Sequence, residues 1–230
     1  MNTSKQLHTY EEILLLALRD KEGTLFFGVN FPQAIAGALL SELFLLKRIK
    51  VEYSGKKKFA IISNNKPIGD PLLDECLGKI ANSKRRVRIE NWVPRFANII
   101  HLKRKAAQSL CRRGILKLEE KKVLLLFTQK VYPEIDPRPE KRLLEKMHKA
   151  IFGNQKNIDQ RIIILIAICN NTGILKQLFD KHQLREKKNW IKEITSGNLI
   201  GDATKEAVEA LQAAIMVAVL MPAVSVAITS

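Results

Sequence analysis

The stretch LHTYEEILLLALRDKEGTL, residues 7–25, decides the fold class, because residues 13–18 form an unbroken apolar run. Thr9 and Glu12 have the spacing of a capping box, in which each side chain accepts a hydrogen bond from the other residue's backbone N–H. Gly23 suits the left-handed turn that ends many helices. A helix that is apolar on nearly every side is a buried one. We therefore expect a core helix here, surrounded by other helices.

The composition indicates a folded protein with an anionic partner. The 230 residues are 46% hydrophobic, which is enough for a sizeable core and argues against disorder. The 39 Lys and Arg residues outnumber the 23 Asp and Glu residues, and the formal net charge is +16. A charge of this size indicates nucleic acid, a membrane surface or an acidic protein as the partner, and it does not choose among them.

The cysteines and the two ends of the chain predict a cytoplasmic protein. Cys76, Cys111 and Cys169 are far apart and form no CxxC pair, so we expect free thiols and no zinc site. The amino-terminal sequence lacks the apolar segment of a secretion signal. Residues 210–230 carry no charge, but they are rich in alanine and contain a proline. We expect a core helix there, and a membrane anchor remains the alternative.

The next part of the sequence alternates between helices and a hairpin. Pro32 suits the first turn of a second helix, where its missing N–H is not needed, and apolar residues then recur every three to four positions as in an amphipathic helix. Residues 49–62 alternate between apolar and polar around a Ser-Gly turn, which predicts a hairpin. Asp70 and Pro71 predict the start of another helix.

The rest of the chain continues this pattern. Residues 95–113 are predicted to form one helix, residues 115–127 a second hairpin with Glu119 and Glu120 at its tip, and the remainder further helices. We therefore expect a mainly α protein, formed by a single globular domain over residues 1–230. Its buried helical core would be ringed by amphipathic helices and accompanied by two short β-hairpins.

The middle of the chain is strongly basic. Ten Lys or Arg residues lie between positions 84 and 113, against a single acid, Glu90. On a helix over residues 95–113, one face would carry His101, Arg104, Lys105 and Arg112. Such a face suits a phosphorylated ligand, which needs several N–H donors. The alternative is that the charges are spread around the surface and only keep the protein in solution.

No motif in the sequence predicts catalysis. The sequence contains no phosphate-binding loop, zinc-protease motif, serine nucleophile elbow or dinucleotide-binding turn. Adjacent acids such as Glu11 and Glu12 point in different directions on a helix, so they do not form a two-carboxylate site. We therefore expect a protein that is not an enzyme and that has no cofactor or metal.

The chain resembles the Golgi phosphoprotein 3 family, because six stretches occur in that family's order and spacing. They are TYEEILLLALRDKEG (9–23), AGALLSELFLLKRI (36–49), GDPLLDECLGKI (69–80), RRGILK (112–117), YP…PEKRLLEKMHKAIFG (132–153) and DQRIIILIAI (159–168). The resemblance implies a mostly helical fold. It also implies a peripheral membrane protein without known catalysis, which binds phosphatidylinositol 4-phosphate and holds glycosyltransferase tails.

The family's headgroup pocket is matched only in part. It uses a Trp in the loop after the first helix, an Arg early in the second helix, and two basic residues on the helix before the second hairpin. The Trp position falls at Phe27 or Gly28, and the Arg position falls at Ala36. The two later positions fall at Ile100 and Lys103. The lipid specificity therefore stays open, and the pattern is closer to bacterial relatives.

From the resemblance and the charge pattern we predict two sets of contact residues. The headgroup would be bound by Lys103, Arg104, Phe27 and His101. The membrane surface would be contacted by Phe26, Phe31, Arg85 and Arg86. For the phenylalanines the alternative is packing onto the core, which we favour for at least one of the three. Trp92, within the basic stretch, suits packing better than headgroup binding.

These inferences favour a cytoplasmic, peripherally membrane-associated protein that binds anionic phospholipids and acts as a trafficking adaptor for the tail of a membrane protein. By family analogy, the second hairpin is expected to join copies into a homo-oligomer. The alternative is a winged-helix-like nucleic-acid-binding protein, since a basic helix precedes a hairpin. Against it, the helix lacks the residues at its start that read bases, and the acidic hairpin tip would repel phosphates.

Overall fold

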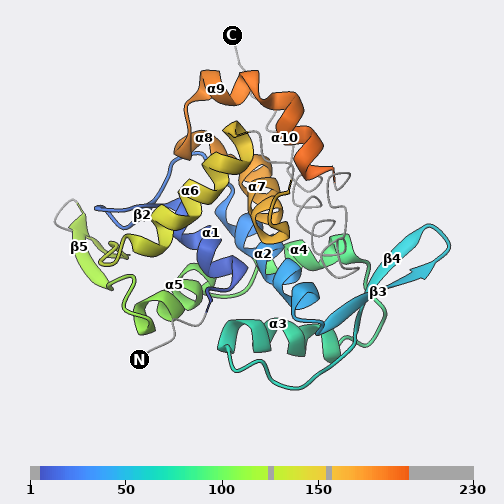
Figure 1. The fold of residues 1–230 in the computed structure, drawn as a ribbon. Coiled ribbons are helices and arrows are strands. Elements are labelled where there is room, and N and C mark those ends of the chain that lie inside the picture. The colour runs from blue at the N-terminus through green and yellow to red at the C-terminus, as the bar shows by residue number, and fades with distance from the viewer. Residues whose placement is uncertain (1–5, 124–126, 154–156, 197–230) are drawn as a thin grey trace, which may run out of the picture.

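The computed structural model describes residues 6–123, 127–153 and 157–196, and this part of the chain is mainly helical (Figure 1). The predicted fold class is therefore confirmed. The expected core helix over residues 210–230 lies outside the described residues. In the part of the chain that the structure describes, no helix is both long enough and apolar enough to cross a membrane.

Three helices form the centre of the molecule: α1 (Thr9–Ala17), α2 (Phe31–Leu45) and α7 (Gln160–Thr172). Every residue of α1 is buried, as its apolar run predicts. Helix α2 is buried on all sides from residue 34 to residue 44, so it is a core helix and not the amphipathic helix that its spacing suggested. The buried apolar side chains form one cluster around these helices.

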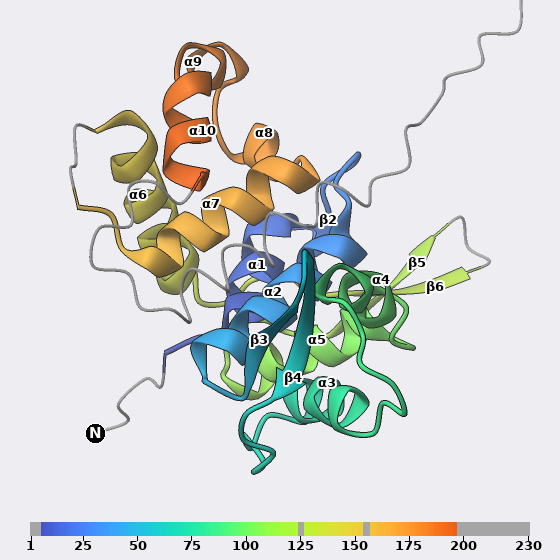
Figure 2. The ribbon, with the colours of Figure 1, turned by 90° about the vertical axis from the view of Figure 1, so that its right-hand side faces the viewer.

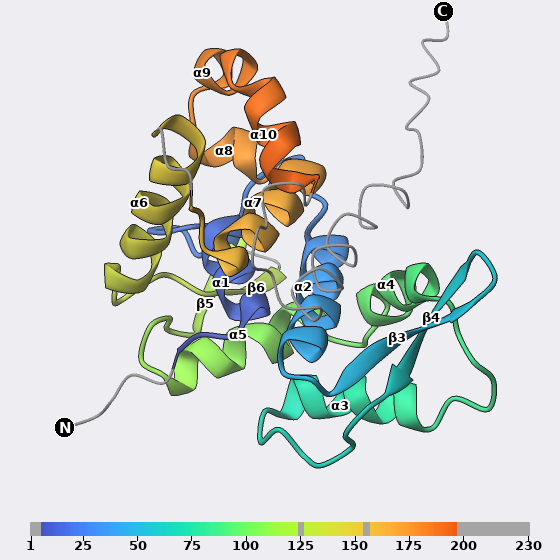
Figure 3. The same ribbon diagram turned by 45° about the vertical axis from the view of Figure 1, so that its right-hand side comes forward.

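The remaining helices cover two sides of this core (Figure 3). One side carries α6 (Arg138–Phe152), α8 (Leu175–Leu178), α9 (Lys181–Glu186) and α10 (Lys188–Thr195). The other side carries α3 (Pro71–Ala81) and α4 (Trp92–Ala97), which follows the short 3-10 helix η1 (Ile89–Asn91). Helix α5 (Leu102–Arg112) packs against α1.

Local sequence signals place α3 correctly. Asp70 accepts hydrogen bonds from the backbone N–H groups of Leu72 (3.1 Å) and Leu73 (2.9 Å), and Pro71 occupies the first turn. The second carboxylate oxygen of Asp70 accepts a hydrogen bond from the hydroxyl of Tyr10 at 2.7 Å. The helix cap therefore also fixes α3 against α1.

The described residues form three two-stranded antiparallel sheets, one more than expected. Strands β3 (Ile49–Ser54) and β4 (Lys57–Ile62) make the first predicted hairpin. Strands β5 (Glu119–Val123) and β6 (Phe127–Val131) make the second, which projects from the helical body (Figure 2). Glu119 and Glu120 lie within β5 and not at the tip, which corrects the predicted register.

The unexpected sheet joins β1 (Leu18–Arg19) to β2 (Thr24–Leu25). Gly23, predicted to end the first helix, lies instead in the turn of this hairpin with φ +62°. A Cβ at this position would lie 2.2 Å from the backbone nitrogen of Pro133. The glycine is therefore required by a contact that is distant in the sequence.

The start of α1 also differs from the prediction. The cap residue is His8, and its backbone N–H donates to Glu11 at 2.7 Å. Thr9 and Glu12 bind other helices instead, because the Thr9 hydroxyl donates to Glu42 of α2 and Glu12 accepts a hydrogen bond from Arg161 of α7. Tertiary partners thus displace the predicted capping box by one residue.

The predicted helix over residues 95–113 is broken. His101 has a left-handed backbone, with φ +58°, and separates α4 from α5. The residues expected to face inward, Phe96, Ile99, Ala106 and Leu110, are all buried. The break therefore turns the chain without changing which residues pack on the core.

Candidate lipid-headgroup surface

Lys103 of α5 rests on an aromatic ring. Its ammonium nitrogen lies 5.6 Å from the ring centroid of Tyr132, which is 3% exposed. Lys103 is half-buried, and burial lowers the pKa of its ammonium group. A cation over an aromatic face is attracted by the ring quadrupole. The contact therefore holds Lys103 at the edge of the core with its charge close to the surface.

The positive charge of Arg104 affects the pKa of the same tyrosine. Burial raises the pKa of the Tyr132 hydroxyl, the nearby Cys111 raises it further, and the positive charge of Arg104 lowers it. The Arg104 side chain itself is exposed. Lys103, Arg104 and Tyr132 thus form a cationic surface with an aromatic base, which we call the Lys103–Tyr132 surface.

Tyr132 also connects this surface to hairpin β1–β2. The backbone N–H of Tyr132 donates to the carbonyl oxygen of Gly23 at 2.9 Å. Strand β2, which follows Gly23, leads directly into the loop that carries Phe26 and Phe27. The 26–30 loop is therefore anchored, through the hairpin, to the segment that supports Lys103.

The three predicted phenylalanines have different environments. Phe27 is 97% exposed, and its carbonyl oxygen accepts a hydrogen bond from Gln177 at 3.3 Å. Phe26 is half-buried, and its backbone N–H donates to Ala17 at 3.0 Å. Phe31 is 4% exposed because it begins α2 and packs into the core. Its predicted contact with a membrane is therefore corrected.

The other positions carried over from the family differ in exposure. Ala36 is fully buried, so this position offers no group to a ligand. Ile100 is 75% exposed, and His101 is exposed directly before the first turn of α5. His101 thus lies two residues before Lys103, at the end of the helix where the predicted headgroup would bind.

Four of the ten basic residues of the middle stretch are paired with acids. Lys105 contacts Glu75 at 2.6 Å, Arg113 contacts Glu11 at 2.9 Å, Arg88 contacts Glu90 at 3.6 Å, and Arg86 contacts Glu52. Arg86 also lies over the ring of Phe59, 5.1 Å from its centroid. Lys105, expected on the cationic face of the helix, is therefore paired with an acid, and Arg86 is held against hairpin β3–β4.

The other six basic residues have no ion pair within the described ranges. They fall on two parts of the chain. Lys103, Arg104 and Arg112 lie on α5, whereas Lys84, Arg85 and Arg95 line a cavity beside Trp92. The basic residues without an ion pair in the described ranges thus come from α5, from α4 and from the segment between α3 and η1. Arg85, predicted to contact a membrane, belongs to the cavity.

A cluster of acids includes Asp20 from the turn of hairpin β1–β2. Asp20, Glu134 and Glu140 bring carboxylate oxygens within 4.8 Å of one another, which is a spacing that a metal ion can bridge. Burial raises the pKa of Glu140 to about 8, with further contributions from the charges of Asp20 and Glu134. Burial likewise raises the pKa of Glu134 to about 7. Burial therefore favours the protonated form of the two glutamates.

Tyr132 is the residue of this surface that the sequence prediction missed. It lies between buried Val131 and half-buried Pro133, directly after hairpin β5–β6. The only signal in the sequence is an aromatic residue at the end of a hairpin. Its contact with Lys103 joins positions 29 residues apart, and no local pattern reports such a contact.

A helical core, a projecting hairpin and a basic helix before it define a protein of the Golgi phosphoprotein 3 class. A model of that family (GPP34) matches residues 10–211, and the chain belongs to this family. The chain is also similar to vacuolar protein sorting-associated protein 74 of Eremothecium gossypii, with 28% identity over 145 residues. The match covers 55% of this chain, which spans 43% of the length of that curated relative.

Proposed function

We propose that this protein is a peripheral membrane protein without catalytic activity, which binds anionic lipid headgroups and acts as a trafficking adaptor. The family supports the general role, and the similar protein is named for vacuolar protein sorting. The observation that carries the proposal is the Lys103–Tyr132 surface, connected through one hairpin to a loop whose Phe27 is 97% exposed.

Lys103 and Arg104 would supply the donors for a headgroup phosphate. The ammonium group of Lys103 lies over the ring of Tyr132, which holds it in place at the edge of the core. Arg104 can form two parallel hydrogen bonds with a phosphate, which adds geometric selectivity. Because burial penalises the ammonium charge of Lys103 in the free protein, a bound phosphate would return favourable electrostatic energy at that site.

Phe27 would enter the membrane interface beside this site. An almost fully exposed phenylalanine contributes apolar area that leaves water on insertion, at about 25 cal/mol per Å². Phenylalanine is also among the side chains that amphipathic helices bury at the membrane interface. Phe26 and His101 would flank the contact, whereas Phe31 stays in the core.

The proposed headgroup is a phosphorylated inositol, by the family phosphatidylinositol 4-phosphate. Ala36 and Ile100 occupy positions that are basic in the Golgi members, so the site offers fewer donors. We therefore expect weaker discrimination between phosphatidylinositol 4-phosphate and other anionic lipids of equal charge. Vesicles of matched charge that contain either lipid measure this directly.

Flotation with vesicles tests the membrane role. Binding should rise with the fraction of anionic lipid and fall as salt rises, because surface charges are screened over about 10 Å at 0.1 M salt. Each basic residue near an anionic leaflet contributes about 1 kcal/mol. Equal binding to neutral and anionic vesicles, or binding that salt does not change, would rule out the electrostatic mechanism.

Hairpin β5–β6 is the proposed contact between copies of the chain. Phe127 on β6 is 68% exposed and Leu118 before β5 is 49% exposed, so the hairpin carries apolar side chains that a second copy could cover. Sedimentation velocity measures the assembly. We expect Phe127→Glu to shift an oligomer toward monomers, and a monomeric wild type at all concentrations would refute the contact.

Nucleic-acid binding is the second candidate function, because basic helix α5 precedes hairpin β5–β6 in the order of a winged helix. Glu119 and Glu120 lie within β5 and are within 4.0 Å of Lys117 and Lys130, respectively, so acids do not mark the hairpin tip. A gel shift with random duplex DNA at about 150 mM salt separates the two functions. Tight binding there would favour this candidate over the membrane role.

A further inference from the structure

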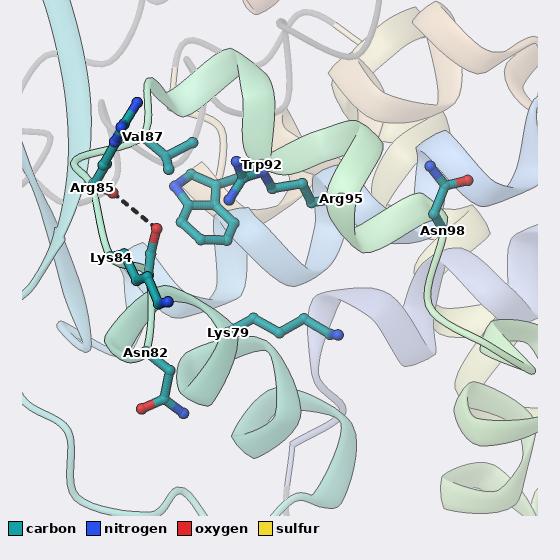
Figure 4. Close-up of a pocket in the computed structure, with 9 residues that line it drawn as sticks. Lys79, Asn82, Lys84, Arg85, Val87, Trp92, Arg95 and Asn98 are labelled. Atoms are coloured by element: carbon teal, nitrogen blue, oxygen red, sulfur yellow. Dashed lines mark hydrogen bonds between the residues drawn. The ribbon is translucent and has the colours of Figure 1, made fainter.

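A positively charged cavity of about 680 Å³ lies between the end of α3 and helix α4, and none of the residues proposed to bind a headgroup lines it (Figure 4). Nine residues line it, and none of them is acidic. They are Lys79, Asn82, Ser83, Lys84, Arg85, Val87, Trp92, Arg95 and Asn98. The volume falls within the usual range for small-molecule sites. The lining combines four cations with side-chain amide and hydroxyl groups.

Trp92 forms the buried base of this cavity. Its side chain is 1% exposed, and the guanidinium of Arg95 lies over its ring, 5.0 Å from the centroid. Figure 4 shows the indole between Arg95 and the Arg85 side of the cavity, with its nitrogen toward Val87. No described residue accepts a hydrogen bond from this nitrogen. A buried N–H donor without a partner is destabilising until an acceptor reaches it.

The cations of the cavity have few acidic neighbours. Lys84, Arg85 and Arg95 form no ion pair with any acid in the described ranges. Lys79 contacts Glu75 at 3.8 Å, but Glu75 is also bound by Lys105 at 2.6 Å. Cations that share a concave site without counter-charge repel one another and raise the local concentration of anions.

The segment that carries Lys84 and Arg85 is held in place by hydrogen bonds. The backbone N–H groups of Asn82 and Ser83 donate to Gly78 (2.9 Å) and Ile80 (3.2 Å), and the Ser83 hydroxyl donates to the carbonyl oxygen of Arg85 at 2.8 Å. The two charged side chains therefore project from a fixed backbone. A preformed arrangement lowers the entropy lost when a ligand binds.

We propose that this cavity binds a compact ligand with two or more phosphate groups, at a site separate from the Lys103–Tyr132 surface. Several cations around one hollow match several phosphates better than one, because each phosphate is best bound by more than one N–H donor. Asn82 and Asn98 add neutral donors at its edges. The proposal does not depend on the membrane role, because it uses none of the residues assigned to that role except Arg85.

The two tryptophans provide a direct readout. Trp92 lies at the cavity, whereas the indole nitrogen of Trp190 donates to the carbonyl oxygen of Ala150 at 3.0 Å. In ¹⁵N-labelled protein each indole N–H gives one signal, and Trp190→Phe assigns them. We expect added pyrophosphate or inositol hexakisphosphate to move the Trp92 signal and to leave the Trp190 signal unchanged. Neither signal moving, or both moving equally, would overturn the proposal.

Vesicles distinguish the two sources of such phosphates. A Trp92 shift with the soluble probes identifies a free ligand. A shift only with vesicles that contain phosphatidylinositol 4-phosphate identifies a lipid headgroup, and both results support the cavity as a phosphate site. No shift with either probe would contradict it.

Matched variants complete the test, because adjacent Lys-Arg pairs occur at four places in the chain, residues 47–48, 84–85, 103–104 and 141–142. The double variant Lys84→Glu with Arg85→Glu should weaken binding of inositol hexakisphosphate about tenfold or more. The variant Lys141→Glu with Arg142→Glu makes the same charge change on exposed positions of α6 and should weaken it less than about twofold. Lys84→Gln with Arg85→Gln repeats the test without added acids. Equal losses at both pairs would show only general charge attraction.

Discussion

The guanidinium of Arg161 on α7 donates to the buried carboxylate of Glu42 on α2 at 2.9 Å. It also donates to Glu12 of α1 at 2.8 Å, so one side chain joins the three central helices. Burial alone would raise the pKa of Glu42, but hydrogen bonds from His8 and Thr9 and the charge of Arg161 outweigh it and lower the value to about 2. For Glu12, the charge and hydrogen bond of Arg161 do not outweigh burial, which raises the pKa of this carboxyl to about 7.

Removing Arg161 should therefore destabilise the protein strongly. In Arg161→Met, Glu12 and Glu42 remain buried without their shared cation. Breaking a buried ion pair from one side decreases the free energy of unfolding by about 3–5 kcal/mol. Urea unfolding followed by circular dichroism measures the change. Arg138→Met removes an exposed pair with Asp136 and should change little. Equal effects of the two substitutions would contradict a structural role for the core pair.

Two glycines with positive φ angles should respond differently to alanine. At Gly23 the new methyl group would meet the backbone of Tyr132 and Pro133, at 2.3 and 2.2 Å, in addition to the strain of φ +62°. At Gly28, with φ +76°, nothing lies within 4 Å, so only the strain of about 1–2 kcal/mol applies. Thermal unfolding should show the larger loss for Gly23→Ala. A similar loss at both sites would mean that hairpin β1–β2 moves freely away from residues 132–133.

The acidic cluster predicts a pH dependence of stability. Folding raises the pKa of Glu140 from 4.5 to about 8, so its contribution is fully present below pH 4.5 and is lost as the pH rises to about 8. Glutamine resembles the protonated acid and does not ionise. We expect Glu140→Gln to match the wild type near pH 4.5 and to be more stable near pH 9, by about 1 kcal/mol or more.

Unfolding at a series of pH values measures this difference. Glu145→Gln, at an exposed position of the same helix, serves as the control and should give a difference that does not vary with pH. A constant difference for Glu140→Gln as well would show that Glu140 is ionised in the folded protein at neutral pH.

Local signals in the sequence predicted the elements that depend on neighbours in the chain. Asp70 and Pro71 fix the start of α3, and the alternation around Gly55 fixes hairpin β3–β4, because both act over a few residues. The first capping box failed because Glu42 and Arg161 compete for Thr9 and Glu12 from other helices. No spacing within residues 7–25 reports those partners.

For the candidate headgroup surface, the sequence predicted the basic residues but not the aromatic one. The pattern places Lys103 and Arg104 on one helix, but it does not reveal Tyr132 beneath them. Nor does it separate Phe27, which is exposed, from Phe31, which is buried, since both are aromatic residues of one loop sequence. Helix α2 draws Phe31 into the core, and that effect depends on the packing of the whole molecule.

Flotation with vesicles that contain phosphatidylinositol 4-phosphate, at about 150 mM salt, tests the membrane role most directly. Lys103→Glu with Arg104→Glu should decrease the bound fraction about tenfold, since two basic contacts of about 1 kcal/mol each are lost and reversed. Lys141→Glu with Arg142→Glu makes the same charge change on α6 and should bind like the wild type. Full binding by the first variant, or an equal loss in both, would contradict a headgroup site at Lys103 and Arg104.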